Sequence, residues 1–329
     1  MFDIYFEPNY GKLYEDIENG ESVVFEHESS YGKIQHTFIK REIPLKVKKE
    51  VYYDIITPYG YGGPIILEAN NKEFLLKEFE EQFEKYCYKN NIVSEFVRFH
   101  PVIQNVQDFS DIYDVNSIRN TVGTNLKDYE DPFQEEFSKS CRKNVRRALR
   151  NDVGYKITEK PNDIKSFLEI YYSTMDRKAA QEYYYFDNNY FDKALEYFRD
   201  NITIVEAIYE EKTIAMGFYF VYNSYIHTHL SGTLSEYLQL SPAYVLRYAL
   251  TEWGKENGYH LIHHGGGTTD DPEDSLYKFK KQFGKNTEFE FHIGKRKWNQ
   301  EIYDLLCKEN GVDKNTAFFP AYRSEDKIK

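Results

Sequence analysis

The chain has 329 residues, 41% of them hydrophobic, and a net charge of −12, which is enough for one large or two medium domains with a sizeable core. This acidic balance argues against DNA binding and other broad nucleic-acid binding, while leaving room for a local basic site. Tyrosine and phenylalanine are abundant, with 31 and 24 residues; they suit clefts for polar, sugar-like ligands, although an AT-rich coding sequence produces the same bias.

The cysteines and the N-terminal sequence point to one compartment. Cys87, Cys141 and Cys307 are far apart and form no CxxC pair, which fits a reducing cytosol and excludes a disulfide framework. The first residues lack the basic start and apolar run of a signal peptide. No apolar stretch approaches the roughly 20 residues of a membrane helix. We therefore expect a soluble cytoplasmic protein without a transmembrane segment.

The first half of the chain shows a strand–loop–helix–strand order. Val51–Ile56 is typical of a strand, and a loop at Thr57–Pro64 follows it. Apolar residues then recur at helical spacing over Asn71–Asn90, and Ser94–Val102 is again typical of a strand. The loop holds three glycines and two prolines, which permit close ligand approach and would present Tyr59 and Tyr61 as ligand contacts. As a bare pattern, the same loop fits a simple turn.

A basic segment, Phe137–Arg150, separates the two halves. On a helical wheel, its apolar residues lie on one face and its cations on the other. The cations are Lys139, Arg142, Lys143, Arg146, Arg147 and Arg150. Arginine side chains suit phosphate, so Arg142 and Arg146 are candidates for binding a phosphate-bearing substrate. The alternative is a solvated face balanced by neighbouring carboxylates.

The second half repeats the order of the first. A helix is expected over Ile164–Met175, and a β-hairpin is expected from Thr203–Ala207 and Ala215–Tyr222. The repeated unit follows, with a strand, a helix opened by Ser-Pro and a second strand; these are Ser224–Leu230, the helix from Ser241, and Tyr259–His263. The last predicted helix is Gln300–Glu309. The repetition predicts two related α/β units that divide near Asp131–Asp152.

A glycine loop follows the second of these strands. In His263-His264-Gly265-Gly266-Gly267, exposed backbone amides can cradle an anion. The loop matches neither a nucleotide phosphate loop nor a dinucleotide fingerprint. Other histidines are near in sequence, at 227, 229 and 260, but their spacing fits no zinc site, so we predict no metal. No serine or cysteine nucleophile pattern is present either.

The segment Ser275–Gly284 carries the strongest candidate for catalysis. With Leu276 at zero on a helical wheel, Phe279 lies at about 300° and Lys280 at about 40°, inside the apolar stripe. The flanking lysines, 278 and 281, fall on the polar side. A buried lysine is costly unless it is paired or used, which favours a functional Lys280. The alternative is that its ammonium reaches water past Phe279.

Five segments occur in the same order as in FemAB-like proteins, from roughly Val51 to Ile293. They are TPYGYGGP, SKSCRKNVRRALRNDVG, HTHLSGT, the GGG loop and LYKFKKQFG. The chain thus resembles peptidoglycan interpeptide-bridge aminoacyltransferases and the GNAT-like N-acyltransferases of polysaccharide gene clusters. The resemblance implies an α/β fold with two tandem GNAT-like (acyl-CoA N-acyltransferase) domains, at 1–140 and 141–299, the second a BioF2-like acetyltransferase region. Residues 300–329 are expected to pack back on the first domain.

The resemblance also implies roles for individual residues. Phe279 and Lys280 match the family's Phe-Lys pair, whose lysine neutralises negative charge during transfer. Arg177 resembles an arginine used on the acceptor's phosphates, and Tyr183 and Tyr225 resemble acceptor-contacting tyrosines. The set of expected substrate contacts is completed by His229, Gly265, Gly266 and Gly267.

These features together predict an N-acyltransferase that acts on an amine of a small-molecule or lipid-linked acceptor: a cell-envelope glycan, nucleotide-sugar or peptidoglycan precursor. The donor is acyl-CoA or aminoacyl-tRNA, and the acidic net charge favours acyl-CoA. Two features of the family are absent from the sequence: the usual loop that binds the coenzyme A pyrophosphate, and the coiled-coil arm of some bridge enzymes. No tightly bound cofactor and no particular oligomeric state are predicted. Asp274 or the acceptor itself is the candidate general base. The alternatives are a tRNA-dependent bridge aminoacyltransferase and a non-catalytic glycan- or nucleotide-binding module on the same fold.

Overall fold

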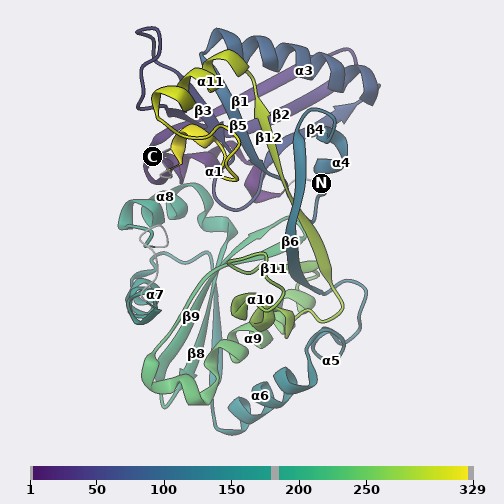
Figure 1. Ribbon diagram of the computed structural model, residues 1–329. Helices are drawn as coiled ribbons and strands as arrows, with labels where there is room; N and C mark the ends of the chain where they lie inside the picture. The colour runs from purple at the N-terminus through teal and green to yellow at the C-terminus, as the bar shows by residue number, and fades with distance from the viewer. Residues whose placement is uncertain (1–2, 179–184, 325–329) are drawn as a thin grey trace. The chain divides into compact units, whose positions relative to one another are not determined.

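The computed structural model describes residues 3–178 and 185–324 and divides into two compact units (Figure 1). The central unit comprises Arg119–Glu290 together with the chain up to Ile4, and the N-terminal unit comprises Tyr5–Ile118 and Phe291–Lys329. The expected boundary at residue 140 therefore falls inside the central unit. Residues 300–324 lie in the same unit as the first strands, so that unit is assembled from two distant pieces of chain.

A mainly antiparallel sheet forms the N-terminal unit. Its strands follow the order β1-β2-β3-β5-β12, and β4 also pairs with β2. The bounds are β1 Gly20–Ser29, β2 Gly32–Glu42, β3 Tyr53–Ile56, β4 Gly63–Ala69, β5 Ile92–Arg98 and β12 Glu288–Lys297. Only β3 and β5 pair in parallel among these strands as described. The expected turn at Thr57–Pro64 thus ends in β4 before the helix begins.

Helix α3, Lys72–Lys89, covers this sheet because every fourth residue along it is buried. The Asn71 side chain accepts a hydrogen bond from the Phe74 amide and so caps the first turn. The buried positions pack with Phe38, Val97 and Trp298 in one core; they are Leu75, Phe79, Phe83 and Cys87. The other helical segments of the unit are η1 Ile4–Phe6, α1 Pro8–Lys12, α2 Glu15–Glu18, α4 Val106–Phe109, α11 Gln300–Glu309 and η5 Ala321–Arg323.

The C-terminal helix α11 completes a second core in this unit. Its buried face packs with Val47, Tyr52 and Val93. Beyond it, Arg323 and Tyr322 reach the buried carboxylate of Asp54, and the Tyr322 hydroxyl lies 2.7 Å from Ser94 Oγ. The segment after residue 300 is therefore tied to the first strands by both apolar and charged contacts.

The strands of the central unit follow the order β6-β11-β10-β9-β8-β7. The bounds are β6 Asp114–Asn125, β7 Gly154–Glu159, β8 Ile202–Tyr209, β9 Lys212–Tyr222, β10 Tyr225–Thr233 and β11 Leu261–Gly265. The expected hairpin corresponds to β8 and β9. All described pairs in this unit are antiparallel except β10 with β11, which are joined by helix α9, Pro242–Glu256.

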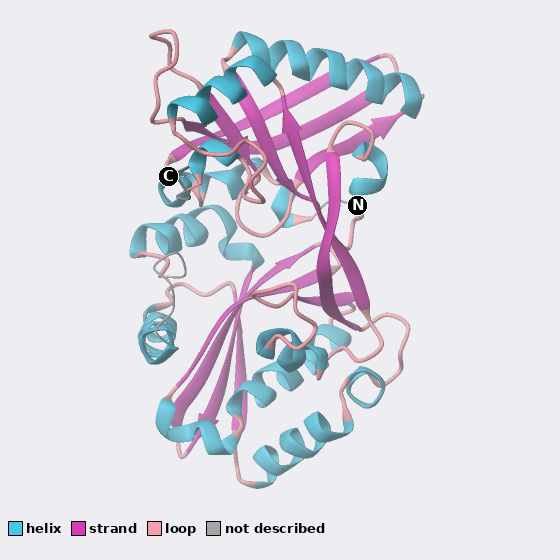
Figure 2. Cartoon of the chain, in the orientation of Figure 1, coloured by secondary structure: helices cyan, strands magenta, loops and turns pink. Residues whose placement is uncertain are grey.

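Helices cover both faces of the strands of the central unit (Figure 2). Helix α7, Lys165–Lys178, packs Phe167 against Phe218 of β9, whereas α9 shares a core with the next residue, Tyr219. Neighbouring residues of a strand point to opposite faces, so α7 and α9 lie on opposite faces. The remaining helical segments are α5 Pro132–Glu136, α6 Lys139–Arg150, α8 Asn188–Phe198, η3 Arg199–Asn201, η4 Ser235–Leu240 and α10 Ser275–Lys281. Among the described residues, no helix combines the length and apolar character needed to cross a bilayer.

Candidate active site

The ammonium of Lys280 lies in the interior of the central unit, on the last turn of α10. It donates a 2.6 Å hydrogen bond to the Gly266 carbonyl. Burial first, and then the nearby cations Arg247 and Arg119, lower the pKa of Lys280 to about 7, while Asp274 raises it. The residue as a whole is half-buried.

The two neighbouring lysines are surface residues. Lys278 pairs with Glu273, and the Lys281 ammonium lies 3.0 Å from Glu288. One lysine of three points inward, as the position of Lys280 on the apolar stripe predicted.

Asp274 is the N-cap of α10. Its Oδ1 accepts from the Tyr277 amide at 2.8 Å, and its Oδ2 accepts from the amides and hydroxyls of Thr268 and Thr269. The Thr268 hydroxyl and the Tyr277 amide are the main causes that lower the pKa of Asp274 well below its usual range. A carboxylate held in this way is a weak base. Asp274 positions α10 and the glycine loop, and the geometry does not favour it as the general base.

The glycine loop is occupied by groups of the chain itself. The amides that follow it bind Asp274, while the carbonyls of Gly266 and Gly267 accept from Lys280 and Arg119. A Cβ on Gly267 would lie 2.5 Å from Asp274 Oδ1, so only glycine allows the cap to approach. Gly265 adopts a φ of +74°, which also favours glycine. The amides that hold the carboxylate of Asp274 thus belong to Thr268, Thr269 and Tyr277 and not to the three glycines, so the expected role of the glycine amides stays a prediction.

Arg247, which sequence reasoning missed, is the second cation of this site. It lies on α9 with 9% exposure, and its Nη1 donates a 2.8 Å hydrogen bond to the Tyr219 hydroxyl. Its Nε has no hydrogen-bond partner among the described residues. A signal was available, because this arginine stands in a mainly apolar helix with no acidic residue three or four positions away.

His264 of β11 adds a neutral nitrogen next to the two cations. It is 2% exposed, and burial, then Arg247 and then Lys280, lower its pKa well below the usual value. Phe279, the predicted partner of Lys280, packs its ring against Tyr244 of α9 and against Phe283, with ring centroids 5.6 and 5.1 Å apart. The site therefore combines two buried cations, a neutral imidazole and an aromatic wall.

Strands β10 and β11 pair in parallel only through Tyr225, Ile226 and His227. From Thr228 onward β10 continues along β9 without β11, and a bulge places His229 as the extra residue. His229 lies 2.6 Å from the Tyr190 hydroxyl, and burial lowers its pKa to about 3, so its imidazole is neutral. Among the described strands, one side of β10 is thus left unpaired by β11 beyond His227.

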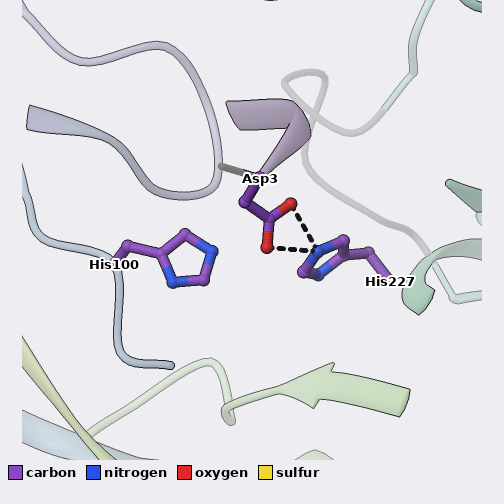
Figure 3. A group of neighbouring side chains, drawn as sticks. All are labelled: Asp3, His100 and His227. Carbon is purple, nitrogen blue, oxygen red and sulfur yellow. Dashed lines mark hydrogen bonds and ion pairs between the residues drawn. The ribbon is translucent and has the colours of Figure 1, made fainter. Parts of the chain in front are cut away.

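The paired start of β10 is anchored by the N-terminus of the chain. His227 Nε2 lies 2.8 and 2.9 Å from the two oxygens of the Asp3 carboxylate (Figure 3). Both residues are almost fully buried. Tyr225, predicted to contact the acceptor, is half-buried, and burial, followed by Asp3, raises its pKa.

The basic helix α6 divides into buried and exposed arginines. Arg142 donates to the carbonyls of Gln134, at 2.8 Å, and Phe137, so it closes the end of α5. Arg146 is exposed, with its guanidinium 5.6 Å from the centre of the Phe133 ring. No cation of α6 forms an ion pair with a described carboxylate; the exposed ones are Lys139, Lys143, Arg146, Arg147 and Arg150.

Two other arginines contact the connection between β10 and α9. Arg177 of α7 donates to the Thr233 carbonyl at 2.7 Å and to Ser235 Oγ at 3.2 Å. Arg147 donates to Ser241 Oγ at 3.2 Å, at the start of α9. Arg177, a predicted substrate contact, thus lies at the end of β10. The second half of this strand does not pair with β11.

Two predicted tyrosine contacts are not in this cluster. Tyr59 and Tyr61 belong to the N-terminal unit, where the Tyr59 carbonyl accepts from the Tyr10 hydroxyl and the Tyr61 ring packs against Tyr5. Their loop is shaped by aromatic packing, since a Cβ on Gly60 would lie 2.5 Å from the Tyr5 ring. Tyr183 lies outside the described residues.

Residues 136–281 match the family model of the acetyltransferase (GNAT) domain, and this stretch lies within the central unit. Among solved structures, the chain is similar to FemX, with 14% identity, coverage of 92% of this chain and 94% of that one, and a TM-score of 0.66. A tandem GNAT protein from the clavulanic acid biosynthesis pathway covers 84% of both chains at 5% identity, with a TM-score of 0.51.

The C-terminal DUF2156 domain of a putative lysylphosphatidylglycerol synthetase from Agrobacterium fabrum is also similar, with 11% identity, coverage of 92% and 91%, and a TM-score of 0.58. No curated protein matches the sequence significantly. The predicted α/β fold with tandem GNAT-like units is confirmed. The matched domain and this fold identify the chain as an acyltransferase of the GNAT fold.

Proposed function

We propose that this protein transfers an acyl group from acyl-CoA to an amine of a cell-envelope glycan, nucleotide-sugar or peptidoglycan precursor. The observation that carries the proposal is the buried ammonium of Lys280 beside Arg247, within the matched acetyltransferase domain. The resemblance of five ordered motifs to FemAB-like proteins supports a cell-envelope acceptor.

In the proposed mechanism, the amine attacks the thioester carbonyl directly, and no covalent enzyme intermediate forms. Negative charge then develops on the carbonyl oxygen, and buried donors directed at such a position are worth far more than exposed ones. Lys280 is the proposed donor, because burial desolvates its charged end. Binding both substrates also replaces a bimolecular encounter with a positioned attack.

The unpaired side of β10 supports a donor that lies along this strand. An extended amide-containing chain, such as the pantetheine arm of coenzyme A, can lie along the part of β10 that β11 does not pair with, beyond His227. Pro242 occupies the first turn of α9 and offers no amide to a pyrophosphate. Arg147 and Arg177, at the two ends of the preceding connection, supply cations instead.

The test is an assay of purified protein with acetyl-CoA and longer acyl-CoA donors against a panel of amino sugars, UDP-amino sugars and muropeptides, followed by mass spectrometry. We expect a product heavier by the acyl group and stoichiometric release of free thiol. Arg147→Gln and Arg177→Gln should raise the KM for acyl-CoA and leave the KM for the amine unchanged. Ligand binding without any transfer would instead support the non-catalytic binding module.

A second candidate, transfer from aminoacyl-tRNA, is favoured by the five exposed cations of α6 that form no ion pair with a described carboxylate. Phosphate contacts release counterions, so tRNA binding should weaken steeply as salt rises. Arg146→Gln combined with Lys143→Gln should then flatten this salt dependence. Transfer from a charged tRNA and not from acyl-CoA would decide for this donor.

A further inference from the structure

The hydrogen bonds of His264 define which of its nitrogens carries the proton. Its Nε2 lies 2.8 Å from Thr124 Oγ1, and that hydroxyl donates a 2.7 Å hydrogen bond to the Phe283 carbonyl. A hydroxyl has one hydrogen, and the carbonyl can only accept it. Thr124 must therefore accept from His264, so Nε2 carries the hydrogen. In the neutral ring this leaves Nδ1 with a free lone pair.

The Nδ1 atom is buried and has no hydrogen-bond partner in the part of the chain that the structure describes. Buried polar atoms without a partner are rare and costly. The charged groups that act on this imidazole are Arg247 of α9 and Lys280 of α10, both cations. The Arg247 Nε is buried and unpartnered in the same way. The surroundings of the imidazole thus combine the charges of two cations with one unpartnered acceptor, His264 Nδ1.

We propose that His264 Nδ1 is the proton acceptor of the acyl transfer, the general base that takes a proton from the attacking nitrogen. The proposal rests on the proposed function and deepens it. A tetrahedral intermediate formed by an amine carries a negative oxygen and a positive N–H group on the same carbon. Two cationic donors next to one bare acceptor are complementary to that pair of charges.

The step balances as follows. The amine, having lost its ammonium proton to solvent, uses its lone pair to form the C–N bond, and the carbonyl π pair moves to oxygen. The N–H proton then moves to the lone pair of His264 Nδ1. The oxygen pair re-forms the C=O bond, the C–S bond breaks, and the thiolate leaves with its electron pair. The imidazolium returns its proton to the thiolate, so amide and free thiol are the products.

The same two cations explain why this base is neutral in the resting protein and becomes more basic during the reaction. In the resting protein, burial and the charges of Arg247 and Lys280 keep His264 neutral. Negative charge on the intermediate's oxygen cancels part of that positive field, so the imidazole becomes more basic at the moment when a proton must be removed. The class of acceptor follows from this: its nucleophile must be a primary or secondary amine, which alone keeps an N–H for Nδ1 after attack.

The experiment compares two replacements of His264 in the full chain with the best donor and amine from the assay above. In His264→Gln the side-chain amide can still donate toward Thr124, but the acceptor at the Nδ1 position is lost. In His264→Asn the amide oxygen can lie near the Nδ1 position, yet it cannot take a proton. His260→Gln, the same substitution next to β11, is the matched control and should behave as wild type.

We expect kcat to fall on the order of 10²–10⁴-fold in both His264 variants, the usual contribution of a general base, with little change in either KM. Full turnover by His264→Asn would show that Nδ1 acts only as a hydrogen-bond acceptor, which would overturn the proposal. Full turnover by His264→Gln would overturn it as well. A wild-type protein that transfers no acyl group would instead contradict the proposed function itself.

A second measurement does not depend on activity or on the stability of the variants. NMR of the wild-type chain with labelled histidine reports which ring nitrogen carries the proton. We expect the Nε2–H form of His264 at neutral pH. An Nδ1–H form would place the lone pair toward Thr124 and overturn the proposal.

Discussion

Two buried polar clusters, one in each unit, are built on opposite principles. In the N-terminal unit the Glu95 carboxylate accepts from Tyr113 at 3.1 Å and from Trp298 at 2.9 Å, and it contacts His36 Nε2. One anion is surrounded there by donors. In the central unit, Lys280 and Arg247 bring two like charges together next to a neutral His264.

The difference separates a cluster whose charge is satisfied within the protein from one with two cations of like charge. A buried carboxylate with several donors is satisfied within the protein, and removing it leaves those donors unpaired. Two buried cations repel each other, and Arg247 contributes to the lowered pKa of Lys280. Such a cluster is costly to the folded state and becomes favourable when negative charge enters it. Substitutions in the two clusters should therefore affect different measurements.

The largest expected effect is on the stability of the N-terminal unit. Glu95→Ala should lower the free energy of unfolding by ~3–5 kcal/mol, because the partners of Glu95 are left buried without an acceptor. Urea denaturation followed by tryptophan fluorescence measures this loss. Glu84→Ala, on the exposed face of α3, is the control and should stay within about 0.5 kcal/mol of wild type. A Glu95 variant as stable as the Glu84 variant would remove the contrast between the clusters.

In the central unit the expected effect is on turnover. Lys280→Met should lower kcat by roughly 10²–10³-fold with little change in substrate affinity, as is typical for loss of one donor to a developing oxyanion. Steady-state kinetics with acyl-CoA measure it. Lys278→Met is the control, since that lysine is an exposed partner of Glu273. Equal losses in the two variants would assign the effect to general surface charge.

The stability of the Lys280 variant should depend on pH in a defined direction. The pKa of Lys280 in the folded protein is lowered from 10.5 to about 7, so between these values the folded state binds fewer protons than the unfolded chain. The contribution of Lys280 to stability therefore rises with pH across this window, and its cost is fully present below about pH 7. Lys280→Met should be more stable than wild type at pH 6, and the gap should narrow toward pH 10.

Thermal unfolding of both proteins at several pH values measures this gap. A gap that is constant with pH would show that the lysine keeps its ordinary affinity for protons. A variant that is less stable than wild type at pH 6 would reverse the sign and place a carboxylate, not Arg247, as the dominant neighbour of Lys280.

The smallest effect distinguishes the arginines of α6. Arg142→Gln should lower the free energy of unfolding by about 1–2 kcal/mol, because Arg142 donates to two carbonyls at the end of α5. Arg146→Gln should change it by about 0.5 kcal/mol or less, since Arg146 is exposed. Chemical denaturation of the two variants compares them directly. If the order were reversed, Arg146 and not Arg142 would be the structural residue.

The spacing of apolar residues was sufficient to predict those helices and strands that bury one face. Helix α3, the hairpin of β8 and β9, and helix α9 were predicted because their apolar residues recur at the proper spacing. The hairpin of β1 and β2 was missed. Strand β1, GESVVFEHES, has no fully buried residue, so its sequence lacks the apolar alternation by which strands are recognised.

The same limit applies to the candidate site. Lys280 was predicted because a charged residue interrupts the apolar stripe of its own helix. Arg247 and His264 lie on other elements, and the tautomer of His264 depends on Thr124 and the Phe283 carbonyl, 140 and 19 positions away in the chain. No local pattern reports such a combination. The glycine loop was predicted to cradle an anion, and only the fold shows that the residues just after it, Thr268 and Thr269, bind Asp274.

The division of the chain has a consequence for the order in which the protein matures. The N-terminal unit takes β12 and α11 from the end of the chain, and Arg323 binds the Asp54 carboxylate. During synthesis the first strands emerge long before these partners, and Trp298, which binds Glu95, follows them by about two hundred residues. The central unit, by contrast, takes only a few residues from the start of the chain and is complete once residue 290 has left the ribosome. The central unit therefore has all of its residues first, and the first strands of the N-terminal unit are made long before their last partners.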